Sequence, residues 1–236
     1  MTSDIVDFAK EMLEKLEEET REKGGNKYYT WTEHLNIWMN TFLPQLQELS
    51  EFEKYNSLMV LRLSELQNLI TWIMISVWYG KYHQAIRELR YILDSIGQAY
   101  YLDIEHPEAT ISCKLEIIKE IEKQTFGARL IDRLDLNHKQ ELKNLYSDLS
   151  KYAHSSYQEL EPLIKEGRGD WRVTFAFDED QFSRTVELTN KVMDAVYFIM
   201  FHRFPKIAKR VKNSKKIMKS MEELGCKLSL SYLRTI

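Results

Sequence analysis

Apolar residues recur along this chain at the three- to four-residue spacing that is typical of α-helices. Residues 3–23 form the first such segment, and Gly24-Gly25 ends it. Thr30 and Glu33 follow with the spacing of a capping box, in which each side chain accepts a hydrogen bond from the other residue's backbone. This pattern predicts that a second helix begins at Thr30.

The next apolar segment is longer and more hydrophobic. Ser50 and Glu53 form another capping-box pattern, which predicts a helix that continues to about residue 79. Residues 69–79 are apolar on nearly every side, so we expect this helix at the centre of the core. Because a membrane span needs about 20 apolar residues and this stretch has eleven, no integral membrane segment is predicted.

The rest of the chain repeats the helical pattern, with one exception. In residues 167–177 apolar and polar side chains alternate, as in a half-buried strand. The last ten residues alternate weakly, which leaves a short strand or disorder open. The prediction is one all-α, multi-helix domain over 1–236, with a short β-like insertion near 170–177. Its further helices are expected over 81–103, after Thr110, from Asn137, over 179–203 after Asp178, and over 205–224.

Composition narrows the class of protein. Eight glycines and four prolines leave few turns, which favours long helices. The two cysteines, Cys113 and Cys226, stand far apart, and the acidic N-terminus does not resemble a signal peptide, so we expect a cytoplasmic protein. The sequence has no metal-binding motif and no nucleotide-binding glycine motif, so neither a metal nor a cofactor is predicted.

Two segments carry polar residues at spacings that suggest chemistry. In residues 82–103, Arg90 and Asp94 are one helical turn apart and can form an ion pair, with Arg87 on an adjoining face. A polar catalytic site is one interpretation. The other is an arginine at the edge of the core that extends its charged end into water beside a local carboxylate.

The second segment is residues 145–160, in which Ser150 and His154 share one helix face. A histidine with a hydroxyl one turn away can be oriented as a general acid or base. It can equally be a helix-end histidine that interacts with the negative end of the helix dipole.

Together the two segments resemble a group of bacterial and archaeal helical proteins near the HEPN superfamily, whose members associate with nucleotides or RNA. The resemblance covers about residues 75–160 and rests on short motifs. The matching residues are Leu89, Arg90 and Asp94 in the first helix, and Tyr146, Leu149, Ser150 and His154 in the second.

The resemblance implies an antiparallel bundle with its core at about 51–203, a homodimer, and a polar site formed by His154, Arg90, Asp94 and Ser150. Many HEPN proteins are metal-independent ribonucleases of defence or toxin systems, in which four to six residues separate an arginine from the histidine that follows it. Here Ser147, Asp148 and Leu149 stand at the positions before His154. The sequence therefore leaves open whether the protein is an enzyme.

Positive charge gathers near the C-terminus. Residues 203–219 contain eight Lys or Arg residues and no acid, although the whole chain has a net charge of −3. We expect Lys206, Lys209, Arg210 and Lys216, together with Arg87, to contact phosphate. The alternative is a solvated basic face that complements the acid-rich N-terminal helix.

Three functions follow from these patterns. The first is an HEPN-like protein that binds nucleotide or RNA, with metal-independent ribonuclease activity left open. The second is a non-enzymatic interaction or dimerisation module, in which the same polar residues form a structural network. The third is a peripheral protein that binds an anionic membrane surface through the basic C-terminal helix.

Overall fold

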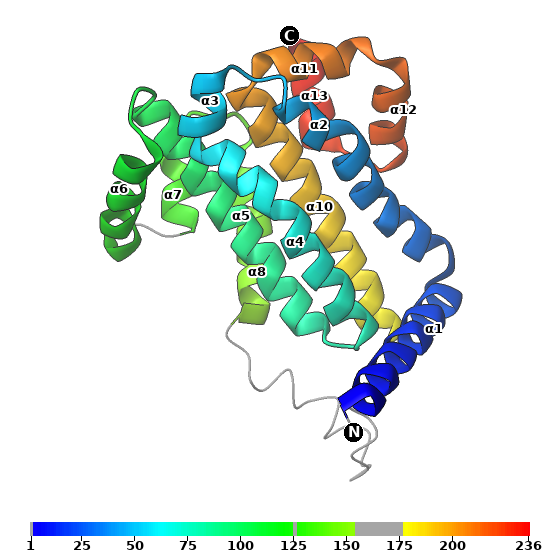
Figure 1. Ribbon diagram of the computed structural model, residues 1–236. Coiled ribbons are helices and arrows are strands. Elements are labelled where there is room, and N and C mark those ends of the chain that lie inside the picture. The colour runs from blue at the N-terminus through cyan, green and yellow to red at the C-terminus, as the bar shows by residue number, and fades with distance from the viewer. Residues whose placement is uncertain (1, 125–126, 154–176) are drawn as a thin grey trace.

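The described residues of the computed structural model, 2–124, 127–153 and 177–236, are helical and contain no strand (Figure 1). The predicted all-α class is confirmed. The β-like insertion near 170–177 lies outside the described residues except for Phe177. The helices are α1 (Thr2–Ile37), a π-helix η1 (Trp38–Phe42), α2 (Leu43–Leu46), α3 (Glu51–Asn56), α4 (Leu58–Trp78), α5 (Tyr82–Glu105), α6 (Ile111–Gln124), α7 (Ala128–Arg133), α8 (Lys139–Ala153), α10 (Glu179–Arg203), α11 (Pro205–Asn213), α12 (Lys215–Glu223) and α13 (Lys227–Thr235).

Several helices begin at the caps that the sequence predicts. Ser50 and Glu53 form the capping box of α3, in which the Glu53 amide donates to the Ser50 hydroxyl at 3.3 Å. Thr110 accepts from an amide in the first turn of α6, and Asp178 does the same for α10. The predicted helix from residue 50 to 79 is nevertheless two helices, because Ser57 takes an extended conformation and caps α4 separately.

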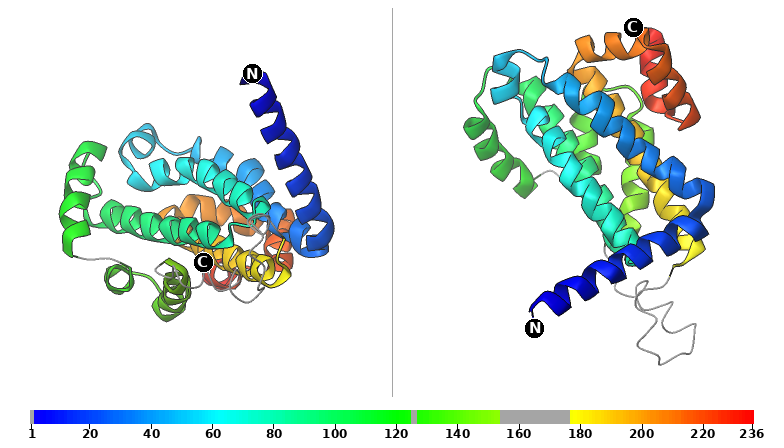
Figure 2. Two further views of the ribbon diagram at one scale, coloured as in Figure 1. Left: turned by 90° about the horizontal axis from the view of Figure 1, so that it is seen from below. Right: turned by 45° about the vertical axis from the view of Figure 1, so that its right-hand side comes forward.

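The N-terminal segment confirms one prediction and corrects another. Gly25, at φ 50°, leaves the helical conformation and divides α1 into two helical segments at a kink, so the first segment ends at the two glycines as predicted. Thr30 is not a cap, because it lies inside α1 and its hydroxyl donates to the Asn26 carbonyl at 3.0 Å. The residues before the kink extend away from the bundle (Figure 2).

The centre of the core is occupied by α5 and α10, not by α4. Residues 192–201 of α10 are buried without interruption. α4 instead lies at the front of the bundle in Figure 1, with Leu61 48% and Trp72 61% exposed. The expectation that the helix ending near residue 79 is central is therefore wrong. Among the described helices only α4 is long and apolar enough to cross a membrane, and 39% of its most apolar window is buried.

Hydrogen bonds fix the direction of the helices around α5. A short turn at residues 79–81 joins α4 to α5, so these two helices run antiparallel. At the start of α5, Tyr82 accepts from the Asp178 amide at the start of α10. At its end, Asp103 meets Arg203 at the end of α10, so α5 and α10 run parallel.

Asp103 is the most highly connected buried polar group among the described residues. Its side chain is inaccessible to solvent, and that of Lys114 on α6 is 1% exposed. The carboxylate joins the start of α4 to α5, α6 and α10. It accepts hydrogen bonds from the Ser57 hydroxyl, the Leu58 amide at 2.9 Å, the Met59 amide at 3.2 Å, the Lys114 ammonium at 2.8 Å and the Arg203 guanidinium at 3.3 Å.

The C-terminal segment corrects two further predictions. The expected single helix over 205–224 breaks at Ser214, which takes an extended conformation, accepts from the Ile217 amide and thereby starts α12. The tail, expected as a strand or disordered, is the helix α13. Asp194 of α10 explains this helix, because its buried carboxylate accepts from the amides of Leu228 and Ser229 at 2.8 and 3.0 Å.

Replacement of Asp103 with alanine tests the junction. We expect Asp103→Ala to lower the free energy of unfolding by about 3–5 kcal/mol, because it leaves the buried Lys114 ammonium without its carboxylate. Urea denaturation followed by circular dichroism measures this change. Glu223→Ala is the control, since it removes a carboxylate from an exposed ion pair with Lys219 and should not change stability measurably. Equal stability of the two variants would contradict the assigned role of Asp103.

Candidate functional site

A polar cluster between α5 and α8 contains half of the expected catalytic residues. Arg90 of α5 donates from Nη2 to the Tyr146 hydroxyl of α8 at 2.7 Å, and its guanidinium lies 5.1 Å from the centre of the Tyr146 ring. Arg90 Nε lies 3.8 Å from Asp94 Oδ2, and the two side chains are 22% and 21% exposed. The predicted Arg90–Asp94 pair is therefore confirmed, and it is half-buried.

A glycine allows the close approach on which this cluster depends. Gly127, at φ 54°, takes a conformation that L-amino acids rarely adopt. A Cβ atom at this position would lie 2.1 Å from the Tyr146 ring. The Gly127 amide also donates to the Asp94 carboxylate. The residue before α7 thus packs against Tyr146 and Asp94 at once.

The environment of Asp94 raises the pKa of its carboxyl group. Burial raises the pKa of Asp94 to about 6, although Arg90 and the Gly127 amide both favour the charged form. The carboxyl group therefore exchanges its proton near neutral pH. Perturbed carboxyl groups of this kind occur at functional sites and also in structural ion pairs.

The remaining catalytic predictions do not join this cluster. The Ser150 hydroxyl donates to the Tyr146 carbonyl at 2.8 Å, one turn back along α8, instead of toward Arg90 or Asp94. His154 lies outside the described residues. The structure thus brings together Arg90, Asp94 and Tyr146, of which the sequence analysis ranked only the first two as catalytic.

The basic residues expected to contact phosphate lie on two different parts of the fold. Arg87 is half-buried on α5, one turn before Arg90. The other four are exposed on the C-terminal helices, which lie at the opposite end of the bundle from the end of α8 (Figure 1). Lys206, Lys209 and Arg210 belong to α11, and Lys216 belongs to α12.

We call the exposed cationic face of α11, α12 and α13 the basic surface. Residues 205–236 contain nine Lys or Arg residues and two glutamates, a net charge of +7. Since the whole chain carries −3, residues 1–204 carry −10. All nine cationic side chains are exposed, namely Lys206, Lys209, Arg210, Lys212, Lys215, Lys216, Lys219, Lys227 and Arg234.

Few carboxylates neutralise the basic surface. Arg210 pairs with Glu48, and Lys219 lies 3.5 Å from Glu223. Among the described residues, Lys206, Lys209 and Lys216 have no carboxylate partner. Apolar residues on the opposite sides of α11 and α12 are buried, among them Ile207, Ala208, Val211 and Met221, so that the lysines point into solvent.

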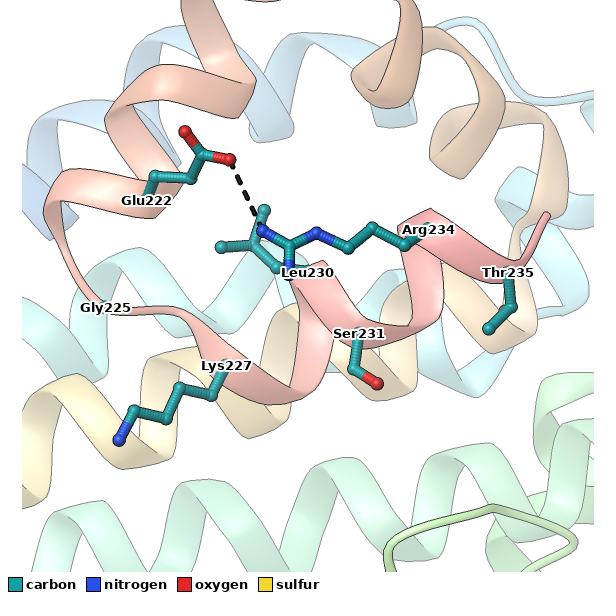
Figure 3. A pocket seen from close by; sticks show the side chains of 7 residues that line it. All are labelled: Glu222, Gly225, Lys227, Leu230, Ser231, Arg234 and Thr235. Carbon is teal, nitrogen blue, oxygen red and sulfur yellow. Dashed lines mark hydrogen bonds and ion pairs between the residues drawn. The ribbon is translucent and has the colours of Figure 1, made fainter.

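A hollow of about 570 Å³ lies beside α13 at the edge of the basic surface (Figure 3). Lys227, Ser231 and Arg234 are spaced along one stripe of α13 and line it. Arg234 reaches back across the hollow to Glu222 of α12 at 3.5 Å. Sequence reasoning missed this stripe because the cap that makes the tail helical, Asp194, is 34 residues away along the chain from Leu228.

Within the described residues no group of three or more His, Cys, Asp or Glu side chains could hold a metal ion. Comparison with known proteins found no matching family model, no matching curated protein and no matching solved structure.

The acidity of Asp94 predicts a pH-dependent contribution to stability. Its folded pKa lies above the usual value, so the stabilisation is present below about pH 4 and is lost as the pH rises through about 6. We expect the free energy of unfolding, taken relative to Asp94→Asn, to fall by about 1–3 kcal/mol over this range. Urea titrations of both proteins at several pH values measure the difference. A constant difference between pH 4 and 7 would show that Asp94 titrates normally.

Proposed function

We propose that this protein binds RNA, and that the basic surface holds the phosphate backbone. The observation that carries the proposal is the set of three exposed lysines, Lys206, Lys209 and Lys216, that have no carboxylate partner among the described residues. The binding of polyanionic RNA to such lysines releases counterions, which favours association. Lysine and arginine side chains that already form an ion pair contribute less binding free energy, because that ion pair must break before they contact a phosphate.

The length of the basic surface favours a polymer over a single nucleotide. α11 has nine residues and is therefore about 13 Å long. Successive phosphates of a nucleic-acid strand are only a few ångströms apart, so α11 alone can face several of them. The lysines continue onto α12 beyond Ser214. A mononucleotide would leave most of these charges without a phosphate.

The contacts of the α5–α8 cluster favour binding without cleavage. A catalytic arginine must be able to turn toward the phosphate at which negative charge develops. Arg90 instead donates to Tyr146 and pairs with Asp94, which fastens α5 to α8. We therefore propose a structural role for these residues and a protein that binds RNA without cleaving it, with ribonuclease activity as the alternative to be tested. Both cysteines are free thiols, which agrees with a reducing compartment such as the cytoplasm.

Neutralisation of the three lysines tests the binding site. We expect Lys206→Gln, Lys209→Gln and Lys216→Gln in combination to weaken binding of a 20-nucleotide single-stranded RNA about 10- to 100-fold at 0.1 M salt. The slope of log K against log salt should become smaller by about 2, since each lost phosphate contact contributes about 0.7. Fluorescence anisotropy between 50 and 200 mM KCl measures both quantities.

The control removes the same charge elsewhere. Lys10→Gln, Lys15→Gln and Lys23→Gln change three exposed lysines of α1. This protein should keep the affinity and the salt slope of the wild type. If both triple variants lose affinity equally, RNA binding depends on net charge and not on the basic surface.

Replacement of Arg90 separates the structural role from a catalytic one. We expect Arg90→Met to lower the free energy of unfolding by about 1–3 kcal/mol, because Tyr146 and Asp94 lose their partner. RNA affinity should not change, and wild-type protein should leave RNA intact over hours. Arg129→Met is the control, because Arg129 is exposed and has no ion pair within the described part of the chain. RNA cleavage that disappears in Arg90→Met and in His154→Ala would establish the ribonuclease instead.

A further inference from the structure

A histidine at the start of α8 has an unusual backbone conformation. His138 has φ 61°, and among the described residues no other residue except glycine has a positive φ. This left-handed conformation costs free energy in a residue with a side chain, and residues that keep it gather at functional sites. The His138 carbonyl still accepts from the Leu142 amide at 3.2 Å, so α8 begins at the next residue. The strained residue thus sets the direction in which its imidazole ring leaves the chain.

The imidazole ring of His138 lies between a carboxylate and a hydroxyl group. Its Nδ1 atom is 3.0 Å from Oε1 of Glu141, one turn along α8. Its Nε2 atom is 3.5 Å from Oγ of Ser231, which belongs to α13. The ring of Phe198 packs nearly perpendicular to the imidazole, with 5.8 Å between the ring centres. Three elements of the fold therefore hold the ring in place.

The chemistry of the three groups fixes their roles in hydrogen bonding. A carboxylate can only accept, so Nδ1 of the neutral imidazole donates to Glu141, and Nε2 accepts from the Ser231 hydroxyl. The hydrogen bond from His138 lowers the pKa of Glu141, so this carboxylate is charged at neutral pH. A hydroxyl, an imidazole and a carboxylate in this order activate a serine as a nucleophile, and such a triad is recognised by its geometry and not by the order of its residues in the chain. Its hydrogen bonds are often long before a substrate binds.

Ser231 also lines the hollow beside α13, where a substrate can reach it (Figure 3). The volume of about 570 Å³ is that of a site for a small molecule. Lys227 and Arg234 lie one turn before and one turn after Ser231 and line the same hollow. The guanidinium group of Arg234 has five N–H donors, and its ion pair with Glu222, at 3.5 Å, engages only one of its nitrogen atoms.

We propose that Ser231, His138 and Glu141 form the catalytic triad of a hydrolase that acts on small carboxylic esters with a negatively charged group. Ser231 Oγ attacks the carbonyl carbon, and its proton passes to His138 Nε2. The ester C–O bond then breaks, the alcohol leaves with that proton, and an acyl group remains on Ser231. A water molecule gives a proton to His138 and bonds to the acyl carbon, after which Ser231 leaves with this proton. One ester and one water thus give one carboxylic acid and one alcohol.

The two cations of the hollow explain the substrate class. Negative charge develops on the carbonyl oxygen during the attack, and Arg234, one turn from Ser231, can stabilise it. Lys227, on the other side of Ser231, attracts the charged group of the substrate. This activity goes beyond the binding of RNA and does not depend on the three lysines that carry that proposal.

Hydrolysis of 4-acetoxybenzoate, a small ester with a carboxylate, tests the proposal. We expect the wild type to hydrolyse it, and Ser231→Ala should lower kcat/KM at least about 100-fold. Ser220→Ala is the matched control, because Ser220 is a half-buried serine of α12 that does not line the hollow. It should keep the activity of the wild type. Lys227→Gln should raise KM several-fold for this ester but not for its neutral analogue 4-acetoxybenzamide.

Separate variants test the histidine and the glutamate. Asparagine accepts a positive φ, so His138→Asn should fold normally while it lowers kcat at least about 100-fold through loss of the base. Glu141 acts through His138 and is a positioning residue. Glu141→Gln should therefore lower kcat and leave KM unchanged, whereas a merely structural role would leave both unchanged in the folded protein. Circular dichroism verifies that each variant is folded.

A fluorophosphonate probe tests the nucleophile independently, because it forms a P–O bond with an activated serine and loses fluoride. Mass spectrometry of the digested wild type should locate the adduct on Ser231, and folded His138→Asn should form none. The proposal is overturned if the wild type hydrolyses the ester no faster than Ser231→Ala, if the adduct forms on another residue, or if folded His138→Asn keeps full activity. RNA affinity should be the same in Ser231→Ala and the wild type, so each of the two proposals can fail without the other.

Discussion

The Asp103 carboxylate is the interaction on which the arrangement of the helices depends. It satisfies backbone amides at the start of α4, which have no partner within the helix. It also binds cations from α6 and α10, so four helices meet at one buried charge. Such a charge is tolerated only with a complete set of donors, and the helices must keep this geometry to supply them. The position of α5 that results brings Arg90 to α8 and leaves the far side of α4 in contact with solvent.

Asp194 has the same role at the C-terminus. It accepts from the amides at the start of α13, and burial raises its pKa while these hydrogen bonds oppose the shift. In both places a carboxylate of a core helix caps another helix that is distant in the sequence. The basic surface depends on this second junction, because α13 completes it and lines the hollow beside it.

These two junctions explain what could be predicted from the sequence. Ser50 and Asp178 cap helices that begin at the next residue, so their patterns are local and the predicted caps are correct. Thr30 has the same local pattern, but α1 continues through it, and a hydroxyl inside a helix can bond to the preceding turn. The ion pair of Arg90 and Asp94 could be predicted, because the two residues lie four positions apart on one helix. The contact between Arg90 and Tyr146 could not, because it depends on how α8 packs against α5.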